Sequence, residues 1–149
     1  MRVTVSIVVN SSAERLFWLS QNYERRLEWD IYLSEAYLLH NEPQAAVGVE
    51  SFCRNKSGSS LTSRYISFAP PTHAAVEMTQ GPWIIQRFGG TWRFKEIRPG
   101  ETEVRFIYNF TCRPAMLRGL IEPFVGLVYK RDMKRRLEAF KLWAEANSE

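Results

Sequence analysis

The N-terminal segment 2–9 alternates between polar and apolar side chains, with Val3, Val5 and Ile7 at every second position. This is the period of a strand with one buried face. A helix signal follows, because Ser11 can accept a hydrogen bond from a free backbone amide while Glu14 reaches back, which predicts a capping box. Apolar residues then predict two short helices, with Leu16, Phe17 and Leu19 in the first and Tyr23, Leu27 and Trp29 in the second.

From residue 31 to residue 110 the pattern is that of strands divided by short breaks. Pro, Gly, Asn and Ser dominate these breaks, at 41–43, 57–59, 70–71, 81–82 and 99–100. No helical period lies between them. We therefore expect consecutive strands to pair as antiparallel hairpins in a meander.

The alternation of apolar and polar side chains is clearest in the last two predicted strands. One face of the final strand carries Val104, Phe106, Tyr108 and Phe110, and one face of the strand before it carries Trp92 and Phe94. Gly89 and Gly90 precede Trp92, and we expect a bulge or a sharp bend there.

After Pro114 the period becomes helical. Apolar residues recur at spacings of three and four and form one inward stripe: Val125, Tyr129, Met133, Leu137, Phe140 and Ala144. We expect Pro123 to break this helix and start it afresh. Between Met116 and Val128 apolar residues occur on all sides, which indicates a further apolar neighbour such as a ligand, a membrane or a subunit. The basic run 130–136 is interpreted as a solvated helix face.

The chain of 149 residues has the length of one domain, 1–149, with 45% hydrophobic and 24% charged residues. This composition excludes a disordered chain and a membrane span. The N-terminus does not resemble a signal peptide, so we expect a cytoplasmic protein. Cys53 and Cys112 are expected to be free thiols, and we expect no metal and no cofactor. The net charge of +4 is too small to predict a nucleic-acid partner, and no aromatic-basic motif supports one.

The order of the predicted elements is strand, two short helices, about six strands and a long helix. This order resembles the START-like superfamily, also called SRPBCC, which includes polyketide cyclases and lipid-transfer domains. The segments that carry the resemblance are 8–17, 27–30, Val47-Gly48, 91–94 and Gly100 with 102–104. The resemblance implies an α+β helix-grip fold. In that fold a curved antiparallel sheet of about seven strands wraps around a long C-terminal helix, and two short helices follow the first strand.

The resemblance also implies an apolar cavity between the sheet and the long helix. The candidate ligand-binding residues are Trp92, Phe94, Phe106, Tyr108, Phe110, Phe124, Tyr129 and Met133. The Tyr108 hydroxyl needs a hydrogen-bond partner if it is buried. We expect that partner to be a ligand oxygen or a water in a cavity, or a main-chain group in a filled core.

No residues form a recognisable catalytic set. The candidates for acid-base chemistry are His73, Glu77, Arg64 and Arg87, with Tyr65 and Tyr108 as hydroxyl donors. Of these, His73 is expected at an exposed strand entrance and Glu77 on the outer face of the sheet. The sequence therefore favours binding, sequestration or transport of a lipid-like or polycyclic hydrophobic molecule without catalysis. Two alternatives stay open: a polyketide aromatase/cyclase, and a partner-binding protein with a vestigial cavity. A transient contact with a membrane surface, and a monomer or a homodimer, are also compatible with the pattern.

Overall fold

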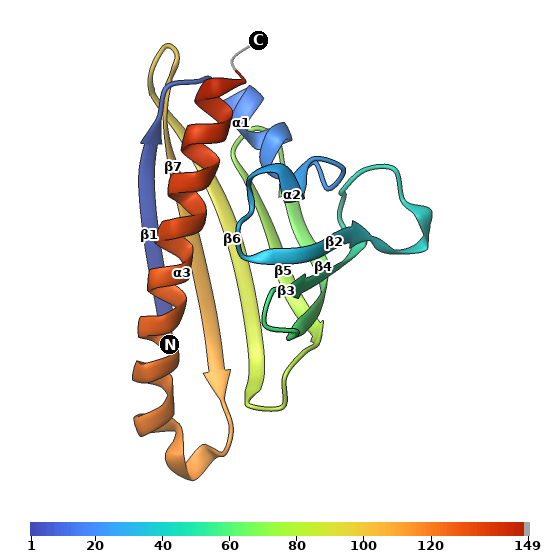
Figure 1. The fold of residues 1–149 in the computed structure, drawn as a ribbon, viewed down its shortest axis with the longest axis vertical. Helices are drawn as coiled ribbons and strands as arrows, with labels where there is room; N and C mark the ends of the chain where they lie inside the picture. Colours follow the sequence, from blue (N-terminus) through green and yellow to red (C-terminus); the bar gives the residue numbers. More distant parts are fainter. Residues whose placement is uncertain (148–149) are drawn as a thin grey trace.

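A curved antiparallel sheet of seven strands lies against one long helix (Figure 1). The structure is a computed structural model and describes residues 1–147. The strands are β1 (Arg2–Val9), β2 (Leu33–Leu38), β3 (Glu50–Asn55), β4 (Ser60–Ala69), β5 (His73–Gln80), β6 (Ile85–Arg98) and β7 (Glu101–Cys112). The helices are α1 (Ala13–Ser20), α2 (Arg26–Trp29) and α3 (Arg118–Ala146), with short 3-10 turns at η1 (Leu39–Asn41) and η2 (Ala115–Leu117).

The strand order in the sheet is β1-β7-β6-β5-β4-β3-β2, and every neighbouring pair is antiparallel. Each strand from β2 to β6 therefore pairs with the next one, which confirms the predicted meander and the helix-grip fold. The order separates Cys53 on β3 from Cys112 on β7 by three strands, and both thiols are free.

The start of α1 differs from the prediction. Ser12, not Ser11, caps the helix, and its Oγ accepts a hydrogen bond from the backbone N–H of Arg15 at 3.2 Å. Because the helix begins at Ala13, Glu14 occupies the second helical position, too early to reach back to the cap. Its carboxylate instead accepts from Trp18 Nε1 at 3.3 Å. The predicted capping box is therefore wrong.

Of the two alternatives predicted at Gly89 and Gly90, a bulge or a sharp bend, the bulge is wrong. The pairing register runs through both residues, and the irregularities of β6 lie at Ile85/Arg87 and Glu96/Arg98. A Cβ built on Gly90 would lie 3.6 Å from the Tyr108 ring. The absence of a side chain at Gly90 thus leaves space on the concave face of the sheet.

The long helix α3 passes through Pro123 without a break, so the predicted restart at this residue is wrong. Proline removes one backbone N–H, and the carbonyl of Gly119 loses its helical partner. Gly119 and Pro123 are both exposed, so water can satisfy that carbonyl.

The inward stripe of α3 is confirmed, with Met133, Leu137, Phe140 and Ala144 buried and Val125 and Tyr129 half-buried. Phe140 packs edge-on against Trp29 at 4.8 Å and against Trp92 at 5.5 Å, measured between ring centroids. This aromatic cluster joins α2, β6 and α3. Among the described residues, none of the helices has the length and apolarity that crossing a bilayer requires.

Candidate functional site

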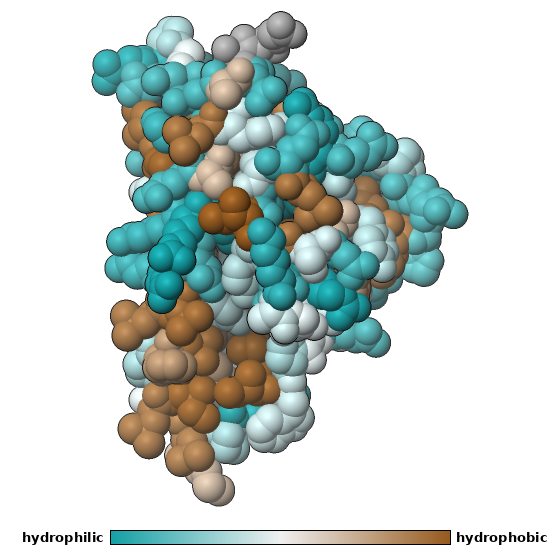
Figure 2. Space-filling model, in the orientation of Figure 1, coloured by the Kyte–Doolittle hydropathy of each residue, from teal (hydrophilic) through white to brown (hydrophobic). Residues whose placement is uncertain are grey.

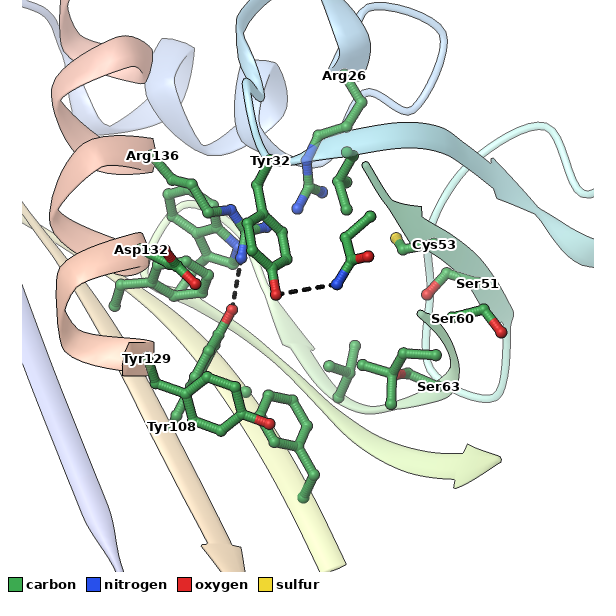
Figure 3. A pocket seen from close by; sticks show the side chains of 18 of the residues that line it. Arg26, Tyr32, Ser51, Cys53, Ser60, Ser63, Tyr108, Tyr129, Asp132 and Arg136 are labelled. Atoms are coloured by element: carbon green, nitrogen blue, oxygen red, sulfur yellow. Dashed lines mark hydrogen bonds between the residues drawn. The ribbon is translucent and has the colours of Figure 1, made fainter. Parts of the chain in front are cut away.

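A cavity of about 160 Å³ lies between α3 and the concave face of the sheet, partly open to solvent. It is lined by side chains from the segment around α2 and from β3 to β7 and α3 (Figure 3). The sheet curves so that β3 and β4 lie away from α3 (Figure 1), and side chains of both strands and of α3 line the same cavity.

One wall of the cavity is aromatic. Trp92 of β6 stacks on Phe106 of β7 at 4.5 Å between ring centroids, and Tyr108 packs edge-on against Phe88 at 4.7 Å and against Tyr129 of α3 at 5.3 Å. Because each ring packs against the next, this wall is rigid. Ala74 and Val76, which have small side chains, and Gly90, which has none, complete this wall.

The opposite wall is polar. Ser51 and Ser63 are each 4% exposed and line the cavity from β3 and β4. The Tyr65 hydroxyl donates to Gln21 Oε1 at 2.6 Å and lies 2.8 Å from the Tyr23 hydroxyl. An enclosed ligand would therefore meet aromatic rings on one side and hydroxyl groups on the other.

Three buried charged residues adjoin the cavity. Arg136 of α3 donates to both oxygens of Asp30, from Nε at 3.1 Å and from Nη2 at 2.9 Å. Arg26 of α2 donates from Nε to the same carboxylate at 2.9 Å. The side chains of both arginines are 8% exposed and that of Asp30 is fully enclosed.

The two arginines determine the charge state of Asp30. Burial raises the pKa of Asp30, but Arg136 and Arg26 lower it more, and the resulting pKa is about 2. Burial lowers the pKa of each arginine, and the Asp30 carboxylate more than offsets this, so both pKa values are raised. All three groups are therefore ionised at neutral pH.

The Tyr108 hydroxyl has a partner that differs from both expectations. It accepts a hydrogen bond of 2.6 Å from Arg136 Nη1, so its partner is neither a ligand nor a main-chain group (Figure 3). Burial raises the pKa of Tyr108, so the phenol stays protonated at neutral pH. Because the oxygen accepts from Arg136, the O–H proton remains available to an acceptor in the cavity.

The structure separates the eight predicted ligand-binding residues into three groups. Trp92, Phe106, Tyr108 and Tyr129 line the cavity. Phe94, Phe110 and Met133 are buried in the core and are not among the lining residues, and Phe124 is 68% exposed on α3. The role of all eight residues in ligand binding remains a prediction.

The candidates for acid-base chemistry lie mostly outside the cavity. Glu77, Arg64 and Arg87 are exposed, and His73 is half-buried with Nε2 2.7 Å from the Ser67 hydroxyl. Of this group, the two hydroxyl donors Tyr65 and Tyr108 line the cavity. Within residues 1–147, no group of three or more His, Cys, Asp or Glu residues could hold a metal ion.

The sequence reasoning missed Arg26, Asp30 and Arg136. The solvated face predicted for the basic run is confirmed for Lys130, Arg131, Lys134 and Arg135, but it is wrong for Arg136, which is 6% exposed. A signal was present, because Arg136 lies three residues after Met133 and four before Phe140 and so falls on the inward stripe.

A sheet that grips one long helix and leaves a cavity between the two defines the helix-grip class of folds. A model of the family described as polyketide cyclase / dehydrase and lipid transport matches residues 1–145. The chain therefore belongs to this family, as its START-like resemblance implied. No curated protein matches the chain.

Several solved structures share the fold at low sequence identity. A protein from Thermus thermophilus has a TM-score of 0.82 at 14% identity, with all of both chains covered. A START superfamily protein from Mycobacterium smegmatis has a TM-score of 0.81 at 12% identity over 97% of each chain. The Zhui aromatase/cyclase from Streptomyces sp. R1128 has a TM-score of 0.80 at 16% identity, covering 100% of this chain and 96% of the other. Similarity at this level establishes the fold alone.

Proposed function

We propose that the protein binds a hydrophobic small molecule in the cavity between α3 and the sheet, for sequestration or delivery. The observation that carries this proposal is the cavity itself, with a stiff aromatic wall facing a wall of hydroxyl groups. Pockets that are mostly apolar and contain a few directed polar groups are the usual binding sites for small molecules.

The volume of the cavity limits the size of the ligand. An enclosed apolar space of roughly 150 Å³ holds a molecule the size of benzene, and the cavity here measures about 160 Å³. One ring or a short chain therefore fits inside, and any longer part of the ligand must extend through the opening. A ligand with one or two rings is favoured over a diacyl lipid.

The protonation states favour binding over acid-base catalysis. Burial raises the pKa of Tyr23, Tyr65, Tyr108, Tyr129 and Cys53, and the pKa of Asp30 is lowered to about 2. Each of these shifts moves the group away from neutrality, whereas an efficient general acid or base has a pKa near the working pH.

Native mass spectrometry of freshly purified protein, followed by solvent extraction, tests this function. We expect an added mass that matches a small apolar molecule recovered unchanged. If the extracted molecule were a cyclised or dehydrated product of a precursor that the protein converts, the polyketide aromatase/cyclase alternative would replace binding. Absence of any apolar ligand, together with no uptake of added apolar molecules, would support a partner-binding protein with a vestigial cavity.

An apolar surface beside the cavity supports a membrane contact as part of this function. We call this surface the front patch, and it consists of Trp83, Ile84, Met116, Leu117, Leu120, Phe124, Leu127 and Val128, each at least 40% exposed. The backbone N–H of Arg113 donates to Ile84 O at 2.8 Å, which holds the β5–β6 loop beside η2. Pro82 of the same loop and Ile85 at the start of β6 line the cavity, so the front patch adjoins the cavity.

We propose that the front patch contacts an anionic membrane surface. Figure 2 shows apolar side chains over the first half of α3 and a hydrophilic band over the turns that follow. That band contains the exposed cations Lys130, Arg131, Lys134 and Arg135. Apolar side chains followed by cations on one helix suit the boundary between acyl chains and anionic headgroups.

A further inference from the structure

Arg26 is a buried cation whose terminal nitrogens face the cavity. The residue is 7% exposed, and its guanidinium lies 5.0 Å from the Trp29 ring centroid and 5.7 Å from that of Tyr23. Its Nε donates to Asp30 at 2.9 Å, while Nη1 and Nη2 have no hydrogen-bond partner among residues 1–147. Figure 3 shows the guanidinium directed into the cavity.

Asp30 does not neutralise both arginines that share it. Arg136 occupies both carboxylate oxygens and places its remaining terminal nitrogen on the Tyr108 hydroxyl. Arg26 donates a single hydrogen bond, from Nε, to the same carboxylate. Asp30 itself is not among the residues that line the cavity; of the described carboxylates only Asp132 is, and it is half-buried on α3 and makes no ion pair among the described residues. Arg26 is therefore the incompletely neutralised cation of the site.

A planar guanidinium with free N–H groups at both terminal nitrogens matches the two oxygens of a carboxylate. A buried cation without a full partner is unfavourable, so an incoming anion gains by completing its pairing. The aromatic wall of Trp92, Phe106 and Tyr108 provides the apolar surface for the rest of such a ligand.

We propose that the ligand is an apolar organic acid whose carboxylate binds the Nη1 and Nη2 groups of Arg26. This inference rests on the proposed function, because it names the chemical class that the same cavity takes. The ring or chain of the acid packs against the aromatic wall, and the Tyr108 O–H is free to donate to the same ligand.

The test compares ligands that share a ring system and differ in charge: 2-naphthoate, 2-naphthamide and 2-methylnaphthalene, each titrated into the full chain by calorimetry or fluorescence. We expect 2-naphthoate to bind about tenfold more tightly than 2-naphthamide, since hydrogen bonds to a charged group are the stronger ones. Arg26→Met should remove most of this preference and leave the affinity for 2-methylnaphthalene nearly unchanged. Arg25→Met, on the neighbouring exposed arginine that pairs with Glu28, is the matched control and should keep the preference.

Arg26→Lys is a second variant, for the case that Arg26→Met does not fold. It keeps a cation beside Asp30 and loses only the planar arrangement of N–H donors. Its preference for 2-naphthoate should fall between those of the wild type and Arg26→Met. Equal affinity of the wild type for 2-naphthoate and 2-naphthamide overturns the inference, as does a preference that survives Arg26→Met. In either case, saturable binding of 2-methylnaphthalene would still support the proposed function. If none of the three ligands binds in a saturable way, both the inference and the proposed function are overturned.

Discussion

Arg136 and Asp30 form a two-point ion pair inside the domain, with N–O distances of 3.1 and 2.9 Å. They lie 106 residues apart in the sequence. The pair joins α3 to the turn after α2, and the third nitrogen of Arg136 reaches Tyr108 on β7. One guanidinium thus connects three parts of the chain at the edge of the cavity.

Asp30→Asn should destabilise the protein strongly at pH 7. The change leaves two buried arginines without their carboxylate, and removal of one partner of a buried ion pair costs about 3–5 kcal/mol. Urea unfolding measures the loss. Glu28→Gln is the control, because Glu28 is exposed and its surface pair with Arg25 should contribute little to the unfolding free energy. A loss below about 1 kcal/mol for Asp30→Asn would show that the buried pair adds little stability.

The same carboxylate should make the unfolding free energy sensitive to acid. The folded-state pKa of Asp30 is about 2, below the value of about 3.9 in an unfolded chain. A depressed pKa contributes stability that is present above the unfolded value and is lost as the pH falls through the folded value. Unfolding measured between about pH 5 and pH 2 should therefore lose more free energy in the wild type than in Asp30→Asn. Parallel curves for the two proteins would contradict this.

Tyr108→Phe should affect both stability and ligand binding. Removing the hydroxyl leaves one Arg136 N–H without its partner, at a cost of about 1–3 kcal/mol of unfolding free energy. A ligand that accepts a hydrogen bond from Tyr108 should bind more weakly by about 1 kcal/mol, while a purely apolar molecule should be nearly unaffected. Calorimetric titration of the extracted ligand and of 2-methylnaphthalene measures the difference. Tyr37→Phe, at a position 47% exposed, is the matched control. Equal losses for both molecules would remove the Tyr108 hydroxyl from ligand binding.

Phe124→Ser should weaken binding to anionic vesicles while leaving Tm almost unchanged, because Phe124 is 68% exposed. Burying one large apolar side chain contributes about 1.5–3 kcal/mol, so the affinity should fall roughly tenfold or more. Co-sedimentation with phosphatidylcholine vesicles, with and without phosphatidylserine, provides the measurement. Leu142→Ser serves as control, because Leu142 is 70% exposed on α3 but outside the front patch. A change in oligomeric mass without a change in vesicle binding would instead make the front patch a subunit contact.

Local patterns in the sequence predicted the strands, the helices and the meander, whereas the helix-grip arrangement was implied by the START-like resemblance. The alternation of Val104, Phe106, Tyr108 and Phe110 and the short breaks between strands are properties of neighbouring residues, and the structure confirms the meander that they predict. The wrong details, at Ser11, Gly89-Gly90 and Pro123, depend on one or two hydrogen bonds each. Such details are decided by the register of the surrounding element.

The site was less predictable, because burial of a charged residue depends on partners distant in the sequence. Arg26 and Asp30 are spaced as a helical i,i+4 pair, a pattern that is common on exposed helices. Only the approach of Arg136 encloses them. The cavity itself depends on the curvature of the whole sheet, which no local pattern encodes.

The most direct test of ligand binding in the cavity is a titration with 2-methylnaphthalene, a neutral fluorophore, on variants that fill the cavity from within. Val76 of β5 lines the cavity, whereas Ile66 on the neighbouring strand β4 is 51% exposed. We expect saturable binding to the wild type and to Ile66→Trp, and a large loss of affinity in Val76→Trp, because the indole occupies the ligand's space. Unchanged affinity in a folded Val76→Trp, or binding to the wild type that never saturates, would contradict a ligand site between α3 and the sheet.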